Sequence, residues 1–319
     1  MSAERAPAGG PGTRVAAIDC GTNTIKLLVA DLDPATGNQV EHVRETRMVR
    51  LGQDVDRTGR LADEALKRAF AAVEEYARLI DRNKVSVVRF CATSAARDAS
   101  NADVFAKGVK RRLGVLPEVL SGAEEARLTF AGATRLLGDV PAPVLVMDIG
   151  GGSTELVLGS GHGQVQAGHS LDVGSVRMTE RHLHSDPPRP EEITAATADI
   201  DRALDTLPGL GLDLTAPRTV VAVSGTGLTV AAAVLDLRHL VRDDLDRAAV
   251  SVQRVHSVID GLLTMSVQAR RALPYMQPGR ADVIGAGALV LDRVLRRTSV
   301  TELHISVSDI LDGIAWSRA

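Results

Sequence analysis

The chain has 319 residues, of which 45% are apolar and 24% charged, which is typical of a soluble globular protein long enough for two domains. A formal net charge of −3 and an aromatic content of 2% exclude a general nucleic-acid binder, which needs a basic excess and stacking rings. No apolar run approaches the roughly 18–20 residues of a membrane span. The two cysteines lack C-x-x-C spacing, which argues against a zinc ribbon or disulfide framework and fits a reducing cytoplasm.

The first 140 residues predict an α/β domain. Residues 1–14 are small, polar and rich in Pro and Gly, so we expect a flexible tail and not a signal peptide. Residues 15–31 predict a strand, a tight turn at Gly21 and Asn23, and a second strand. Apolar spacing predicts an amphipathic helix over 61–80. A strand running into a polar turn and a helix start is expected over 85–99, and a second helix over 121–137.

A Gly-Asp-Val-Pro-Ala-Pro break at 138–143 marks the predicted domain boundary, with one domain over 15–140 and the next over 141–307. After it, VLVMDIGGGSTELVLG (144–159) predicts another strand–turn–strand unit. The apolar strand within 219–227 is expected to end in a further glycine turn. This strand could form a third wall of a cleft between the two domains.

The two strand–turn–strand units are internal repeats. Placing Asp19 over Asp148 aligns the turn and the second strand, with the pairs Gly21 and Gly150, Thr24 and Ser153, Leu27 and Leu156, and Leu28 and Val157. The repeats differ in the sign of one charge, because Lys26 falls over Glu155. Duplicated units predict two similar domains that face each other across a cleft.

The repeated turns have the composition of phosphate-binding loops, because small residues leave backbone N–H groups and short hydroxyls free to approach oxygen atoms. The candidate phosphate-binding loop residues are Gly21, Thr22, Asn23, Thr24, Gly150, Gly151, Gly152 and Ser153. Asp19 and Asp148 precede the turns and could hold Mg²⁺ or Mn²⁺ against phosphate oxygens. Lys26, Ser94 and Arg97 are further phosphate-contact candidates, and the alternative for Arg97 is a solvated helix charge.

Two adjacent glutamates begin the helix predicted over 121–137. Ser121 and Glu124 fit a capping box, in which Glu124 turns back toward the N-cap. Neighbours on a helix point about 100° apart, so Glu125 is free to orient an attacking water. Glu125 is therefore the candidate base and Glu124 the alternative, while a plain interpretation is two exposed acids favoured by the helix dipole.

From about Val15 onward the sequence resembles the exopolyphosphatase / guanosine pentaphosphate phosphatase family, within the actin, sugar-kinase and Hsp70-like group. AAIDCGTNTIKLLVAD and VMDIGGGSTELVLG resemble its two phosphate motifs, FCATSAARDA its Thr-Ser-x-x-Arg segment and VLSGAEEARLTFAG its catalytic-glutamate helix. The resemblance implies two ribonuclease-H-like domains, Glu125 as base, Arg97 on phosphate, and Asp148 and Glu155 placing metal or water. SVSDILDGIAW resembles the closing helix of the family, expected over about 308–319 and against the first domain.

The resemblance is to the short two-domain form and implies a homodimer. The cysteine usage places the expected location in the cytoplasm. The favoured reaction is Mg²⁺-dependent removal of the terminal phosphate of inorganic polyphosphate by water that Glu125 aligns. The alternatives are cleavage of the 5′-end phosphate of guanosine pentaphosphate, an ATP-binding kinase or nucleotide-gated assembly protein of the same fold, and a non-catalytic phosphate sensor. No Walker loop, dinucleotide fingerprint or serine-hydrolase elbow is present, and neither nucleic acid nor membrane is an expected partner.

Overall fold

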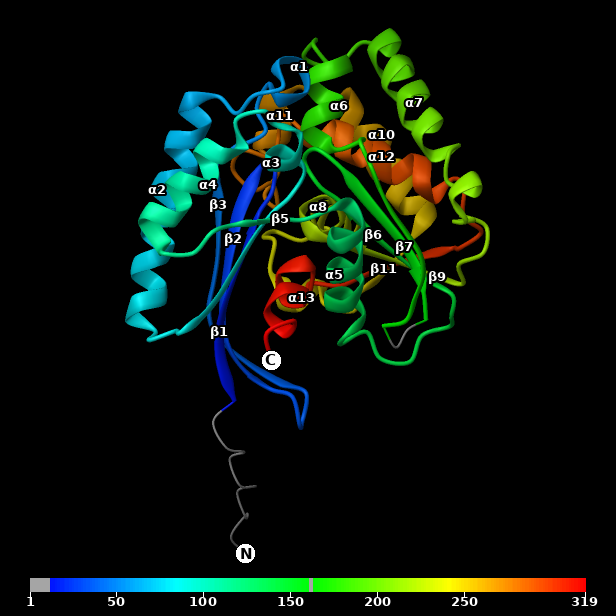
Figure 1. Cartoon of the computed structure of the whole chain (residues 1–319). Coiled ribbons are helices and arrows are strands. Elements are labelled where there is room, and N and C mark those ends of the chain that lie inside the picture. Colours follow the sequence, from blue (N-terminus) through cyan, green and yellow to red (C-terminus); the bar gives the residue numbers. More distant parts are fainter. Residues whose placement is uncertain (1–11, 161–162) are drawn as a thin grey trace, which may run out of the picture.

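The computed structural model describes residues 12–160 and 163–319, which form two mixed β-sheets with helices on their faces (Figure 1). The predicted α/β fold is confirmed. Residues 1–11 of the predicted tail lie outside the described residues, whereas Thr13 and Arg14, which we assigned to the tail, already belong to the first strand. Within the described ranges, no helix combines the length and the apolar character needed to cross a membrane.

The first sheet has the order β3-β2-β1-β4-β5. Its strands are β1 (Thr13–Cys20), β2 (Thr24–Asp33), β3 (Asn38–Met48), β4 (Val87–Ala92) and β5 (Glu118–Val119). The first three strands form an antiparallel meander, and β4 and β5 continue parallel to β1. The helices of this half are α1 (Val55–Thr58), α2 (Asp63–Arg82), α3 (Ser94–Asp98), α4 (Ala102–Leu113) and α5 (Gly122–Thr134).

The second sheet has the order β10-β11-β9-β6-β7-β8. Its strands are β6 (Val144–Ile149), β7 (Thr154–Gly159), β8 (Val165–Leu171), β9 (Thr219–Val223), β10 (Ala249–Ser251) and β11 (Glu302–Ile305). Strands β6, β7 and β8 form an antiparallel meander, with β9 and then β11 parallel to β6. This order repeats that of the first sheet, so the two similar units that the internal repeat predicts are present. Their strand order fits the ribonuclease-H-like domains that the resemblance implies.

Eight α-helices follow residue 143 in the described part of the chain. They are α6 (Ser175–His182), α7 (Pro190–Leu204), α8 (Ser224–Val234), α9 (Arg242–Leu245), α10 (Val252–Thr264), α11 (Val267–Arg271), α12 (Ile284–Leu295) and α13 (Ile310–Trp316). Helices α5 and α13 lie between the two sheets (Figure 1), where α5 packs on β7 and β8 and α13 packs on β1 and β2. The C-terminal helix therefore contacts the first sheet.

Local patterns explain most of the elements. In α2, apolar residues from Ala65 to Ile80 recur on one buried face, which confirms the amphipathic helix with a shift of two residues. The glycine turn expected after β9 is wrong, because α8 begins directly at Ser224. Ser224 has a φ of 58°, so the chain passes from β9 into α8 through one residue in the left-handed conformation.

Candidate active site

The two repeated turns have the same backbone geometry. The amide of Gly21 donates to the carbonyl of Thr24 at 2.9 Å, and that of Gly150 donates to the carbonyl of Ser153 at 3.0 Å. In the strand pairs that lead into these turns, Asp19 lies opposite Lys26 and Asp148 lies opposite Glu155. The alignment of the repeats is thus confirmed at atomic level, including the position where lysine replaces glutamate.

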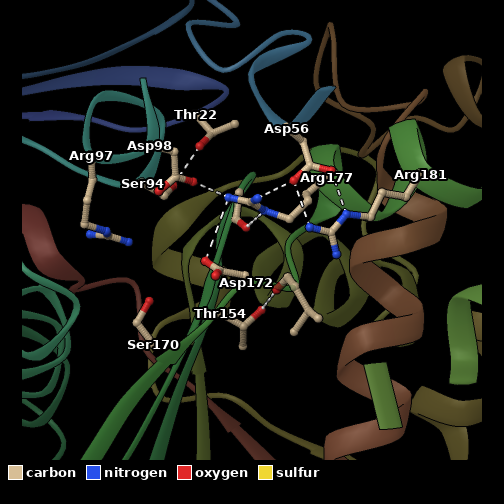
Figure 2. Close-up of polar contacts among 12 residues, drawn as sticks. Thr22, Asp56, Ser94, Arg97, Asp98, Thr154, Ser170, Asp172, Arg177 and Arg181 are labelled. Carbon is tan, nitrogen blue, oxygen red and sulfur yellow. Dashed lines mark hydrogen bonds and ion pairs between the residues drawn. The ribbon is translucent and has the colours of Figure 1, made fainter. Parts of the chain in front are cut away.

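A cleft between the two turns collects most of the candidate residues. Those that line it are Asp19, Gly21, Thr22, Asn23, Thr24, Lys26, Ser94, Glu125, Asp148, Gly150, Gly151, Ser153 and Glu155. The hydroxyls of Thr22 and Ser94 lie 2.8 Å apart, so the first turn and the start of α3 are joined at the wall of the cleft (Figure 2). Gly152, Glu124 and Arg97 do not line it.

The two glutamates at the start of α5 have different surroundings. Glu124 completes the capping box, because its carboxylate accepts the Ser121 amide at 3.2 Å and its own amide donates to the Ser121 hydroxyl at 3.3 Å. Glu125 is 6% exposed and faces the cleft. The cap geometry therefore separates the two carboxylates as the helix argument predicts.

Arg97 is directed at Glu125. Its guanidinium donates to a Glu125 carboxylate oxygen and to the Leu120 carbonyl, each at 2.9 Å. Burial raises the pKa of Glu125 to about 7, and the Arg97 charge opposes that rise. A carboxylate with such a pKa can accept a proton near neutral pH. In this structure Arg97 thus orients the candidate base, and its predicted contact with phosphate stays a prediction.

Acidic side chains from both sheets meet in the cleft. Burial raises the pKa of Asp19 to about 7, and the charges of Asp309 and Asp148 add to the rise. Burial likewise raises the pKa of Asp148 to about 6, with a contribution from Asp309. The pKa of Glu155 is also raised, by burial and by the Glu125 and Asp148 charges. Each of these carboxylates would be stabilised in its ionised form by a bound cation.

The donor set fits Mg²⁺ held jointly with a substrate. Within residues 12–160 and 163–319, no group of three or more His, Cys, Asp or Glu side chains has the arrangement of a complete metal cage. Mg²⁺ is usually bound by one or two carboxylates, waters and substrate phosphates, which Asp19 and Asp148 can satisfy. Glu155 fits this role less well, because its carboxylate already accepts the Ser170 hydroxyl at 2.7 Å.

The individual candidates from the sequence did not include two charged residues at this site, Asp309 beside the cleft and Arg280 on its lining. Asp309, the N-cap of α13, accepts the Lys26 ammonium at 2.7 Å, while Asp19 lies 3.7 Å from the same nitrogen. Asp309 lies inside the segment SVSDILDGIAW, so this motif could have identified it. Lys26 is therefore shared between two carboxylates.

Arg280 is the second residue that the sequence analysis missed. It lines the cleft, and burial lowers its pKa to about 10. It forms no ion pair with any described residue, and its Nε has no hydrogen-bond partner there. Gly225 allows this placement, since a Cβ at that position would lie 2.0 Å from both terminal guanidinium nitrogens. A half-buried guanidinium without a carboxylate partner is suited to a phosphate group.

Comparisons with known proteins agree with this arrangement. Residues 36–318 match the model of the Ppx/GppA phosphatase family. A Mycobacterium tuberculosis protein named exopolyphosphatase 2 is 46% identical, over 96% of this chain and 99% of that protein. The crystal structure of an exopolyphosphatase-like protein is 42% identical with a TM-score of 0.92, over 96% of this chain and 98% of the other.

More distant crystal structures share the same fold. An exopolyphosphatase from Cytophaga hutchinsonii has a TM-score of 0.89 at 26% identity, covering 96% of this chain and 97% of that one. The Aquifex aeolicus member of the Ppx/GppA family has a TM-score of 0.80 at 28% identity, with the same shares covered. From the family match, the full-length relative and the duplicated turns, the chain belongs to the Ppx/GppA phosphatase family.

Proposed function

We propose that the protein is an exopolyphosphatase that hydrolyses the terminal phosphate of linear inorganic polyphosphate. The observation that carries the proposal is the pair of matching turns at Gly21 and Gly150, which face one cleft with Glu125 on its wall. The names of the Mycobacterium tuberculosis and Cytophaga hutchinsonii relatives support the same activity.

The residues of the cleft would have different roles in phosphoryl transfer. The turn amides and the Thr22, Thr24 and Ser153 hydroxyls would hold the terminal phosphoryl oxygens, and Lys26 and Arg280 would offset their charge. Glu125 would accept a proton from water as the water oxygen bonds to the terminal phosphorus. The bridging P–O bond then breaks, and the shortened chain leaves with the electron pair of that bond.

Asp19 and Asp148 would hold a divalent cation, Mg²⁺ or Mn²⁺. Such an ion supplies positive charge next to the non-bridging phosphate oxygens. Lys26 would remain beside Asp19 and Asp309, which keeps a second positive charge at the same point of the cleft. Asp19 and Asp148 are thus the candidates for neutralising the charge of the substrate as it binds, through the cation that they would hold. Glu155 lies beside them and is bonded to Ser170.

Phosphate release tests the proposal directly. Purified protein is incubated with Mg²⁺ and, separately, tripolyphosphate, long-chain polyphosphate, guanosine pentaphosphate and ATP, each with and without EDTA. We expect release from polyphosphate that EDTA abolishes. No aromatic residue lines the cleft among the described residues, so a guanine base has no ring to stack on and should give slower release. Absence of release from both polyphosphates would contradict the proposal.

The predicted homodimer and the cytoplasmic location stay predictions. Analytical ultracentrifugation of the purified protein would measure the oligomeric state independently of activity.

A further inference from the structure

The first backbone N–H groups of helix α6 donate hydrogen bonds to the second phosphate turn, residues 150–153. The Ser175 amide donates to the Gly150 carbonyl at 2.9 Å, and the amides of Val176 and Arg177 donate to the Gly151 carbonyl at 2.8 and 3.1 Å. The first N–H groups of a helix have no partner inside the helix, so here the turn supplies their acceptors. Any displacement of α6 therefore displaces the turn at 150–153.

The Arg177 side chain extends this attachment to the other half of the molecule. Its Nε donates to the Gly152 carbonyl at 2.7 Å, while its two terminal nitrogens bond to Asp56 and Asp98 of the first half (Figure 2). Asp172 lies 3.9 Å from one of those nitrogens. The Arg177 side chain is only 11% exposed, so solvent screening of these bonds is limited. Arg177 thus contacts the turn and the opposite half at once.

Two further side chains of α6 reach the same segment of the first half. Arg181 donates to both carboxylate oxygens of Asp56, at 2.6 and 2.8 Å (Figure 2). Glu180 accepts the backbone amide of Asp54 at 3.1 Å. The contact is therefore formed by one face of a helix and does not depend on a single surface ion pair.

Asp56 and Asp98 belong to segments that support the first phosphate turn. Just before Asp56, the Gly52 amide donates to the Thr22 carbonyl at 2.8 Å. Asp98 ends α3, whose first residue, Ser94, shares a hydrogen bond with Thr22. The carboxylates of Asp56 and Asp98 that Arg177 bonds are thus connected to the first turn, whereas the Arg177 Nε is bonded to the second turn.

We propose that Arg177 is a positioning residue, which sets the separation of the two phosphate turns by bonding Gly152 with one N–H and Asp56 and Asp98 with others. This inference rests on the proposed function only for its kinetic consequence. A phosphoryl group that both turns must contact is aligned with the water at Glu125 only when that separation is correct. An error of about 1 Å in such alignment can lower a rate about 100-fold.

The kinetic test compares Arg177→Gln and Arg177→Lys with Arg293→Gln. Arg293 forms a bidentate ion pair with Asp201 at 2.9 and 3.0 Å within the second half, and serves as the matched control. We expect kcat for polyphosphate to fall about 10- to 100-fold in both Arg177 variants, with a smaller change in KM. Lysine retains the charge but not the planar fork. A fully active Arg177→Lys enzyme would overturn the proposal.

A distance measurement tests the proposal without any activity. Spin labels at Lys67→Cys on α2 and Arg202→Cys on α7 report on the two halves, because both positions are exposed and the two native cysteines are buried. We expect Arg177→Gln to broaden and lengthen the label distance, and Arg293→Gln to leave it unchanged. Asp98→Asn, a milder change, should give an intermediate distribution if Arg177→Gln folds poorly.

The two proposals fail separately. If the wild-type protein releases no phosphate but the label distance depends on Arg177, the positioning role stands and the proposed function is wrong. If polyphosphate is hydrolysed and neither kcat nor the label distance differs between wild type and Arg177→Gln, the positioning role is wrong.

Discussion

Glu124 and Glu125 are neighbours in sequence, yet the helix directs one to its own N-terminus and the other into the cleft. Glu124 has a lowered pKa, because the Ser121 hydroxyl and amide stabilise its charge. Burial raises the pKa of Glu125 to about 7. The chemistry of a carboxylate therefore depends here on a turn of 100° around the helix axis and not on residue type.

Replacing these glutamates one at a time separates the two roles. Glu125→Gln should reduce kcat for polyphosphate about 100- to 10,000-fold, because an amide cannot accept the proton of water. Binding should persist, since the turns are unchanged, and isothermal titration calorimetry measures it. Glu124→Gln is the matched control and should turn over near the wild-type rate. Full activity of Glu125→Gln would contradict its role as base.

Arg280 allows a second prediction at the scale of single residues. Charge-assisted hydrogen bonds to phosphate contribute roughly 1.5–3 kcal/mol, so Arg280→Gln should lower kcat/KM for polyphosphate about 10- to 100-fold. Gly225→Ala should have a similar effect, because its Cβ would displace the guanidinium. Steady-state kinetics measures both variants.

Gly209→Ala is the control for the substitution at Gly225, since nothing lies within 4 Å of the added Cβ. It should leave kcat/KM unchanged. If Gly225→Ala matches the wild type while Arg280→Gln is impaired, the arginine acts from a position other than the one in this structure.

At the scale of whole elements, α5 and α13 bring the site together. Helix α5 carries Glu125, and α13 begins after Asp309, the partner of Lys26. The two helices cross so closely that a Cβ on Gly313 would lie 2.0 Å from the Leu128 carbonyl oxygen. Since that atom belongs to the helix backbone, it cannot move aside as a flexible side chain could.

Gly313→Ala should therefore force the two helices apart. Overpacking of this kind typically costs about 1–3 kcal/mol, which we expect as a loss in the free energy of unfolding. Urea denaturation measures it, and kcat should also fall because Asp309 shifts relative to Lys26. Gly261→Ala, in α10 with open space around the added Cβ, is the control. Equal stability of Gly313→Ala and wild type would contradict the close crossing.

At the scale of the molecule, the repeat explains how much was predictable from sequence. Each of the two repeated turns is local, with Asp19 and Gly21 two residues apart, so its pattern is visible in the chain. The bond between Lys26 and Asp309 joins residues 283 positions apart, and no local pattern specifies it. Arg280 was missed for the same reason, because its place in the cleft depends on Gly225 and on the packing of both halves.

Bringing the two halves together also concentrates negative charge. The cleft gathers carboxylates from β1, β6, β7 and α5, and Asp309 lies beside them on α13. Burial and the neighbouring carboxylates raise the pKa values of Asp19 and Asp148, and the Lys26 charge opposes that rise without cancelling it. Such a cluster of buried carboxylates lowers the stability of the folded protein when it is ionised and favours a bound cation.

The last prediction concerns the stability of the metal-free protein. A carboxyl whose folded pKa lies above its unfolded value holds protons more tightly in the folded state, so its contribution to the free energy of unfolding falls as pH rises through that window. For Asp148 the window runs from 3.8 to about 6, and for Asp19 from 3.8 to about 7. Both contributions are therefore fully lost above pH 7.

Asp148→Asn should remove part of that loss while keeping an acceptor for the Ser224 hydroxyl, which now bonds to Asp148 at 2.9 Å. As the pH rises from 4 to 7, the free energy of unfolding of the metal-free variant should increase relative to that of the wild type, by on the order of 1 kcal/mol. Urea denaturation at both pH values measures the difference. Mg²⁺ should stabilise the wild type more than the variant, because an ion bound to the folded state favours it. Parallel pH profiles with equal responses to Mg²⁺ would show that Asp148 neither repels its neighbours nor holds the ion.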